Sequence, residues 1–155
     1  MRALTVMLSC GYGRRAAADQ VIAVPADDAR MNAAIAKARA TVGTFVTALR
    51  APTASQSSFS IKIPISNGDD REHFWLSDVR YDGTVFSGKI DNEPATVTTV
   101  KIGQAISARL AEISDWMYVD HGKLVGGYTL RVLRDGLSPA ERAEFDRSIP
   151  FKIDS

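Results

Sequence analysis

Charged side chains in the C-terminal half of the chain are the first candidates for chemistry. The acid–base candidates are Asp115, His121 and Arg131, which could act together with Asp91 or Glu93. General acid–base catalysis needs such groups within hydrogen-bond reach around a cleft, and residue types alone do not supply that geometry. Each group also has a structural interpretation, because an aspartate can cap a turn and an arginine can pair with a buried carboxylate. A small enzyme that uses Asp115, His121 or Arg131 is therefore an alternative hypothesis, and no catalytic residue is assigned.

Three aromatic residues lie beside a pair of glycines in the same part of the chain. Trp116, Tyr118 and Tyr128 could line a groove for an extended peptide or a small apolar group, since aromatic rings bind well once they are desolvated. They could equally be large core residues, with Gly126 and Gly127 allowing close approach of the backbone. The core interpretation is favoured. Mutation would test the binding candidates, which are Trp116, Tyr118, Tyr128, Asp115 and Arg131.

The composition disfavours several other classes of function. A formal charge of +1 over 155 residues gives no basic field for a nucleic acid backbone. His73 and His121 are far apart and have no cysteine at ligand spacing, so we expect no metal site. The glycines match neither a phosphate-binding loop nor a nucleophile elbow, and we expect no cofactor. We also expect no transmembrane segment, because no run approaches the ~18 apolar residues of a spanning helix. A partner would be another protein or a peptide, and the sequence indicates no oligomeric state.

Residues 1–20 have the features of a degenerate or truncated export signal. Arg2 supplies a positive charge, Ala3–Leu8 is a short apolar stretch, and Ala16–Ala18 offers the small residues that signal peptidase accepts. This predicts a periplasmic or secreted protein with one folded domain over residues 21–155, and a cytoplasmic protein is the alternative. Cys10 supports a further hypothesis, a lipid-anchored envelope protein, because it follows a leucine and a serine as in a lipoprotein cleavage box.

The first regular element after this segment is an amphipathic helix. Asp27 and Asp28 are suitable N-cap residues, and their charge favours the positive end of a helix. Apolar residues then recur with a period of 3.6 from Met31 to Leu49, which predicts one buried face. Pro52 cannot continue the helix.

An antiparallel sheet of four to five strands is expected next. Phe59–Ile65 alternates apolar and polar residues, which predicts a strand with one buried face. Pro64 within it indicates an edge strand or a bulge, because proline has no N–H to donate. The Asp82-Gly83 pair predicts a hairpin. The expected strands are Phe59–Ile65, Phe74–Tyr81, Thr84–Ile90, the β-rich stretch Ala95–Ile102, and Gln104–Ile113.

The C-terminal third predicts one or two short helices. The segment 124–134 fits a strand and a helix about equally, and we slightly favour a short helix that begins near Gly127 and stops at Gly136. Ser138 and Glu141 form a capping box with a proline at the first helical position, which predicts a last helix to about Arg147. The fold class is therefore α+β.

Long stretches of the chain resemble a known bacterial family. The segment Ile113–Arg134, ISDWMYVDHGKLVGGYTLRVLR, closely resembles the C-terminal motif of the YegJ-like family, a domain of unknown function. The resemblance extends to His73–Pro94, Lys101–Ser107 and Asp27–Val42, and so covers nearly the whole chain from about Val21. It implies an α+β domain, often behind an export signal. It implies no activity and no catalytic residues.

The favoured hypothesis is a non-enzymatic binding or interaction module. Its curved sheet is expected to present a surface near Trp75, Trp116 and Tyr118. The small enzyme and the lipid-anchored protein are the two rivals.

Overall fold

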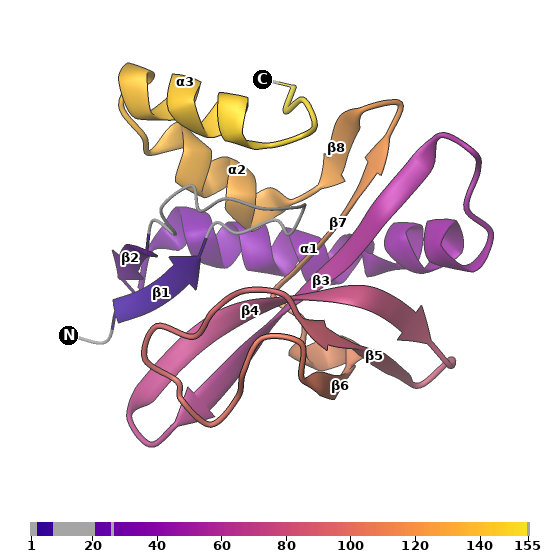
Figure 1. Cartoon of the computed structure of the whole chain (residues 1–155), viewed down its shortest axis with the longest axis horizontal. Coiled ribbons are helices and arrows are strands. Elements are labelled where there is room, and N and C mark those ends of the chain that lie inside the picture. The colour runs from indigo at the N-terminus through magenta and orange to yellow at the C-terminus, as the bar shows by residue number, and fades with distance from the viewer. Residues whose placement is uncertain (1–2, 8–20, 26, 155) are drawn as a thin grey trace.

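The computed structural model describes residues 3–7, 21–25 and 27–154. Helix α1 (Ala29–Arg50) runs across a strongly twisted sheet, and α2 (Tyr128–Asp135) and α3 (Pro139–Ser148) lie together at one end of the molecule (Figure 1). The predicted α+β class, with its N-terminal helix and two short C-terminal helices, is confirmed. No helix in the described part of the chain is both long and apolar enough to cross a membrane.

The sheet contains more strands than the four to five that the sequence predicts. Six antiparallel strands lie side by side in the order β6-β5-β4-β3-β7-β8. Two further strands, β1 and β2, pair with each other, and β1 runs parallel to the start of β4. The bounds are β1 (Ala3–Met7), β2 (Val21–Pro25), β3 (Gln56–Asn67), β4 (Asp70–Tyr81), β5 (Val85–Ile90), β6 (Ala105–Arg109), β7 (Asp115–Asp120) and β8 (Lys123–Gly126).

The strand predicted at Ala95–Ile102 is wrong. The backbone N–H groups of Ala95, Thr96 and Val97 all donate to the buried carboxylate of Glu72, at 2.9 to 3.1 Å. A single side chain thus satisfies donors that would otherwise need a neighbouring strand. The segment contributes Val97 and Val100 to the core without forming a strand.

The strand predicted at Gln104–Ile113 also needs correction. It divides into β6 and a short 3-10 turn, η1 (Leu110–Glu112), which leads into β7. Within residues 1–20, the described segment Ala3–Met7 forms β1. Cys10 and Ala16–Ala18 lie outside the described residues.

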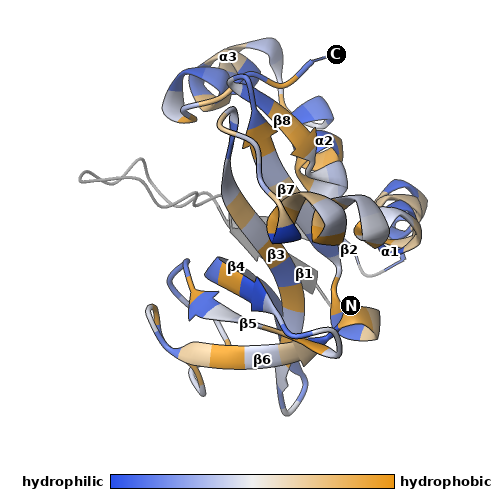
Figure 2. Ribbon diagram, turned by 90° about the vertical axis from the view of Figure 1, so that its right-hand side faces the viewer, coloured by the Kyte–Doolittle hydropathy of each residue, from blue (hydrophilic) through white to orange (hydrophobic). Residues whose placement is uncertain are grey.

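The amphipathic helix is confirmed as α1. Asp28 is its N-cap and accepts a hydrogen bond from the Met31 N–H at 2.9 Å. The buried stripe of α1 packs against the sheet in the main core, where Phe45 contacts the rings of Phe59, Phe86 and Trp116. Apolar and hydrophilic positions alternate along β4, as Figure 2 shows, so that its apolar residues Phe74 and Leu76 join this core.

Strand β3 changes partner halfway along its length. It pairs with β7 from Gln56 to Lys62 and with β4 from Ile61 to Asn67. Pro64 therefore lies in a stretch that has a partner on one side only, although β3 is central in the strand order. Proline is tolerated there because the missing N–H breaks no ladder.

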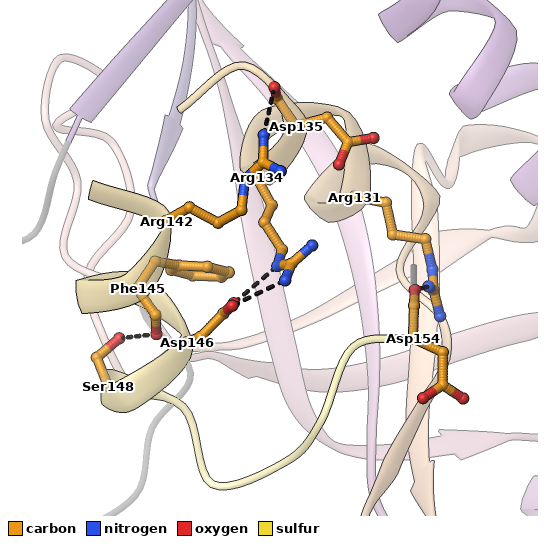
Figure 3. Close-up of polar contacts among 8 residues, drawn as sticks. All are labelled: Arg131, Arg134, Asp135, Arg142, Phe145, Asp146, Ser148 and Asp154. Atoms are coloured by element: carbon orange, nitrogen blue, oxygen red, sulfur yellow. Dashed lines mark hydrogen bonds and ion pairs between the residues drawn. The ribbon is translucent and has the colours of Figure 1, made fainter. Parts of the chain in front are cut away.

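The ambiguous segment 124–134 contains a strand and a helix. Strand β8 ends at Gly126, and α2 begins after Gly127, both of which have positive φ angles (75° and 62°). The predicted short helix that stops at Gly136 is confirmed, and so is the capping box of α3. Helices α2 and α3 are joined by a two-pronged ion pair of Arg134 with Asp146, both contacts at 2.7 Å (Figure 3).

Candidate functional site

Asp115 is fully buried and caps helix α2 from outside the helix. Its carboxylate accepts hydrogen bonds from the N–H groups of Trp116 (2.9 Å), Tyr128 (3.1 Å) and Thr129 (2.8 Å), and from the Thr129 hydroxyl. The N-cap residue of α2, Gly127, has no side chain that could satisfy these amides. Negative charge at this position also favours the positive end of the helix dipole. Asp115 therefore fixes α2 to β7.

Lys62 lies directly opposite Asp115 on the neighbouring strand and is fully buried as well. Its Nζ donates to the Thr129 hydroxyl at 2.9 Å and lies 4.8 Å from the centre of the Trp75 ring. Burial lowers the pKa of Lys62 to about 8, against the attraction of Asp115, which favours the charged form. Burial likewise raises the pKa of Asp115, and Lys62 opposes that rise. Thr129 links the two groups, since its hydroxyl accepts from Lys62 and donates to Asp115.

A second buried polar pair adjoins Lys62. His73 Nδ1 lies 2.8 Å from the hydroxyl of Ser114, and that hydroxyl is 3.2 Å from the carbonyl oxygen of Lys62. The Ser114 proton can serve only one of these acceptors, so donation to the carbonyl places the histidine proton on Nδ1. Burial lowers the pKa of His73 to about 3, and the positive charges of Lys62, Arg71 and Arg39 add to the effect. His73 is thus neutral, and its buried Nε2 has no hydrogen-bond partner among the described residues.

These groups include a serine–histidine pair and a lysine of low pKa, both of which occur in nucleophilic catalysis. Here, however, they are sealed in the interior, where a substrate cannot reach them in this conformation. Lys62, His73, Ser114 and Asp115 all have exposed fractions of 4% or less. The cluster therefore serves to hold β3, β4, β7 and α2 together.

Sequence reasoning missed this cluster, apart from Asp115. The alternation in β3 assigned Lys62 to a solvent-facing side, yet β3 is buried on both faces there. The only available signal was a lysine between Ile61 and Ile63 at a position where the next strand carries an aspartate.

The predicted acid–base residues have separate partners. His121 lies in the exposed turn between β7 and β8, with Nδ1 2.8 Å from the Asp120 carboxylate. The guanidinium of Arg131 donates to the carbonyl oxygens of Gly126 and Leu124 at 2.9 to 3.0 Å and so ties α2 to β8. It also donates to the Asp154 carbonyl oxygen at 3.0 Å, which ties α2 to the C-terminal segment (Figure 3). In the described part of the chain, neither residue forms a side-chain hydrogen bond or ion pair with Asp115, which is buried with Lys62.

The predicted aromatic candidates pack within the fold. Trp116 is 1% exposed, and its Nε1 donates to the Ala38 carbonyl of α1 at 2.9 Å. Tyr118 and Trp75 are also buried, whereas Tyr128 is half-buried and contacts Trp116 edge-on and the Thr41 hydroxyl. These rings do not form the open surface that was expected near Trp75, Trp116 and Tyr118. A binding role for Trp116, Tyr118, Tyr128, Asp115 or Arg131 stays a prediction.

A groove of mixed polar and apolar lining lies elsewhere, where β3 and β4 diverge; we call it the bulge groove. Beyond the pair Ile61–Leu76 the two strands separate, and each then carries a bulge. Ser58 in the first bulge and Asp78 in the second have φ angles of 56° and 51°, and both line the groove, whose volume is about 980 Å³. Non-glycine residues in the left-handed region store strain, and such strain is concentrated at functional sites.

The walls of the bulge groove carry hydrogen-bonding groups of both kinds. Serine hydroxyls line it together with the Asp78–Lys89 ion pair, whose atoms are 3.1 Å apart, and with Arg80 and Asp91. Phe59 and Phe151 supply apolar surface. Among the surfaces of the described residues, this groove can offer donors, acceptors and apolar contact to a ligand at once.

The fold and its surfaces define an α+β domain whose titratable cluster is internal and which carries an open groove at the bulges of β3 and β4. Residues 28–153 match the model of a family described as "Uncharacterized protein conserved in bacteria (DUF2314)", and the chain belongs to this family. It is similar to "Uncharacterized protein YegJ" of Escherichia coli (strain K12), with 35% identity over 134 residues that cover 84% of this chain and 86% of the relative. The resemblance read from the sequence is confirmed.

A second relative matches a shorter part of the chain. It is the "Putative ankyrin repeat protein NMB1133/NMB1171" of Neisseria meningitidis serogroup B (strain ATCC BAA-335 / MC58), 34% identical over 90 residues. The match covers 56% of this chain and 36% of that relative. No solved structure matches the chain.

Proposed function

We propose that this chain is a binding module that holds a surface segment of another protein in the bulge groove. The observation that carries the proposal is the pair of strained bulges, at Ser58 and Asp78, that line one groove. The Ser58 bulge interrupts the pairing of β3 with β7, and the Asp78 bulge interrupts the pairing of β4 with β5. Strain is therefore stored in both strands where they line the concave surface. The internal position of Lys62, His73 and Asp115 favours binding over catalysis.

A relative's name gives further support. Ankyrin repeats stack into extended concave surfaces that bind other proteins. Part of this chain is similar to a protein named as a putative ankyrin repeat protein, which associates the family with a binding architecture.

Affinity capture with variants that alter only the groove tests the proposal. Ser87 is exposed on β5 and lines the bulge groove, so Ser87→Trp fills the groove without reaching the core. Thr99→Trp is the matched control, since Thr99 is exposed outside the groove. We expect a protein that is captured by the wild type and by Thr99→Trp, and lost with Ser87→Trp, while all three chains unfold at the same urea concentration.

Two outcomes would count against it. Equal capture of the same protein by all three chains would remove the groove from the binding surface. Capture of no protein above the background of an unrelated domain would contradict the binding module itself.

We further propose that the protein is exported, with a periplasmic or secreted location. The support is the N-terminal pattern of Arg2, the apolar stretch Ala3–Leu8 and the small residues Ala16–Ala18. Cleavage after Ala18 would remove β1, which pairs with β2 and β4. Mass spectrometry of the mature chain decides the matter: an N-terminus at Asp19 supports export, a lipid on Cys10 supports the anchored alternative, and an intact Met1 contradicts both.

A further inference from the structure

A second concave surface lies between two strand edges; we call it the edge notch. Ile63, Pro64 and Ser66 of β3 form one wall, Ile106 and Ala108 of β6 form the other, and the turn η1 closes the end where β6 leads toward β7. Its volume is about 490 Å³. The notch shares no lining residue with the bulge groove.

Both walls of the edge notch are strand edges with a partner on one side only. Strand β6 pairs with β5 and with no other described strand. Beyond Lys62, β3 pairs only with β4. An open edge presents backbone donors and acceptors that can pair with an added strand.

The two edges differ in their capacity to accept a strand. Pro64 removes a donor from the β3 edge, which is a common protection against unlimited sheet growth. The five residues of β6 contain no proline and no bulge. An added strand would therefore pair with β6, and its side chains would contact the apolar residues of the β3 wall.

The charged side chains that line the edge notch determine which kind of added strand it favours. Arg39 and Arg71 are both exposed and line it. Arg39 donates from Nε to the Ile113 carbonyl at 2.9 Å, and no ion pair of either arginine is found among the described residues. The lining carboxylate, Glu112, is already paired with Arg109 at 3.1 Å. The notch therefore has a net positive field, which favours an acidic partner.

We infer that the edge notch binds an extended acidic segment of a partner protein, which adds to the sheet as a strand beside β6. This inference rests on the proposed binding function, but on a different surface from the bulge groove. Backbone pairing along β6 gives the contact its direction, Ile63 and Ile106 take apolar side chains, and the two arginines take carboxylates.

A short peptide of alternating glutamate and valine, blocked at both ends, is the probe. It favours an extended conformation with one acidic and one apolar face. The isotope-labelled full chain is titrated with this peptide and with its lysine–valine counterpart, and amide chemical shifts and amide exchange are recorded by NMR. The variants are Arg71→Gln, Arg39→Gln and, as a control of equal charge change in the bulge groove, Arg80→Gln.

The expected result has three parts. The acidic peptide shifts amides on both walls of the notch and slows exchange within Ile106–Ala108, and the basic peptide does neither. Arg71→Gln and Arg39→Gln each weaken binding several-fold, about tenfold together, while Arg80→Gln leaves it unchanged. Raising the salt from about 50 mM to about 500 mM weakens binding further.

Three other results would overturn the inference. Shifts that centre on Ser58 and Asp78 and depend on Arg80 would place acidic peptides in the bulge groove, and would leave the proposed function intact. Shifts at the notch without slower exchange in β6 would show ionic contact without strand addition. The absence of any shift with the acidic peptide would remove the notch as a binding surface, whatever the capture experiment on the bulge groove shows.

Discussion

The buried lysine should make the stability of this protein depend on pH in the alkaline range. Burial lowers the pKa of Lys62 from 10.5 to about 8. The unfolded chain therefore binds more protons than the folded chain between these two values, and the free energy of unfolding rises as the pH rises through this window. A pKa shift of this size corresponds to about 3 kcal/mol, gained between about pH 8 and about pH 10.5.

Replacement of Lys62 by methionine isolates this effect. Methionine is similar in length, can keep the contact with the Trp75 ring and carries no charge. Asp115 would retain its three amide donors and the Thr129 hydroxyl. We expect Lys62→Met to be less stable than the wild type at pH 7, because it leaves the buried Asp115 carboxylate without its counter-charge. We expect the variant to lose about 3 kcal/mol more relative to the wild type as the pH rises to about 10.5.

Urea unfolding, followed by the fluorescence of the two buried tryptophans, measures the difference at a series of pH values. The informative quantity is the difference in unfolding free energy between Lys62→Met and the wild type. Other groups titrate in the same pH range, but their contributions are the same in both chains and cancel in this difference. Lys89→Met is the control, since Lys89 is an exposed lysine on β5 that pairs with Asp78. The difference in unfolding free energy between Lys62→Met and the wild type could also stay constant from pH 7 to about pH 11. That result would refute the lowered pKa of Lys62 in the folded chain.

Three further substitutions test the packing around the cluster. Glu72→Gln should cost about 2–3 kcal/mol and accelerate amide exchange at Ala95–Val97, because an amide cannot accept from all three N–H groups. An unchanged exchange rate there would contradict the anchoring role. Gly126→Ala should cost about 2–4 kcal/mol in urea unfolding, since an added Cβ would lie 2.6 Å from the Trp116 ring at a φ of 75°; wild-type stability would show that the hairpin yields easily. Asp115→Asn should cost about 3–5 kcal/mol and reduce helical circular dichroism as α2 loosens, because it leaves a buried lysine without its counter-charge; a loss below about 1 kcal/mol would contradict the capping role.

The sequence predicts well the elements whose signals are local. The α1 stripe, its Asp28 cap, the Asp82-Gly83 hairpin and the Ser138 capping box are all found as expected. Each depends on hydrogen bonds or periodicity within a few residues of the chain, so neighbours in sequence carry the information.

The parts that sequence reasoning missed depend on distant residues. Ala95–Val97 looks like a strand until the Glu72 carboxylate, more than twenty positions away, supplies its acceptors. Lys62 looks solvent-facing until Asp115 and α2 cover it. The bulge groove lies where β3 changes its partner from β7 to β4, and no residue type predicts such a change.

The buried Lys62–Asp115 pair lies where the sheet divides, between the bulge groove and the edge notch. Lys62 and Asp115 are cross-strand partners at the last paired position of β3 and β7, next to the Ile61–Leu76 pair where β4 begins to diverge. A shift of one residue between β3 and β7 would move Lys62 onto the opposite, apolar face, where Phe45 and Trp116 pack. The cost of burying a charge among those rings opposes that shift far more strongly than a pair of apolar residues would. The same register places the Ser58 bulge in β3, and β3 becomes an open edge only beyond Lys62, its last residue paired with β7. The internal charges therefore help to set the point at which the sheet divides and both concave surfaces begin. In the proposed binding module they would act without touching a ligand.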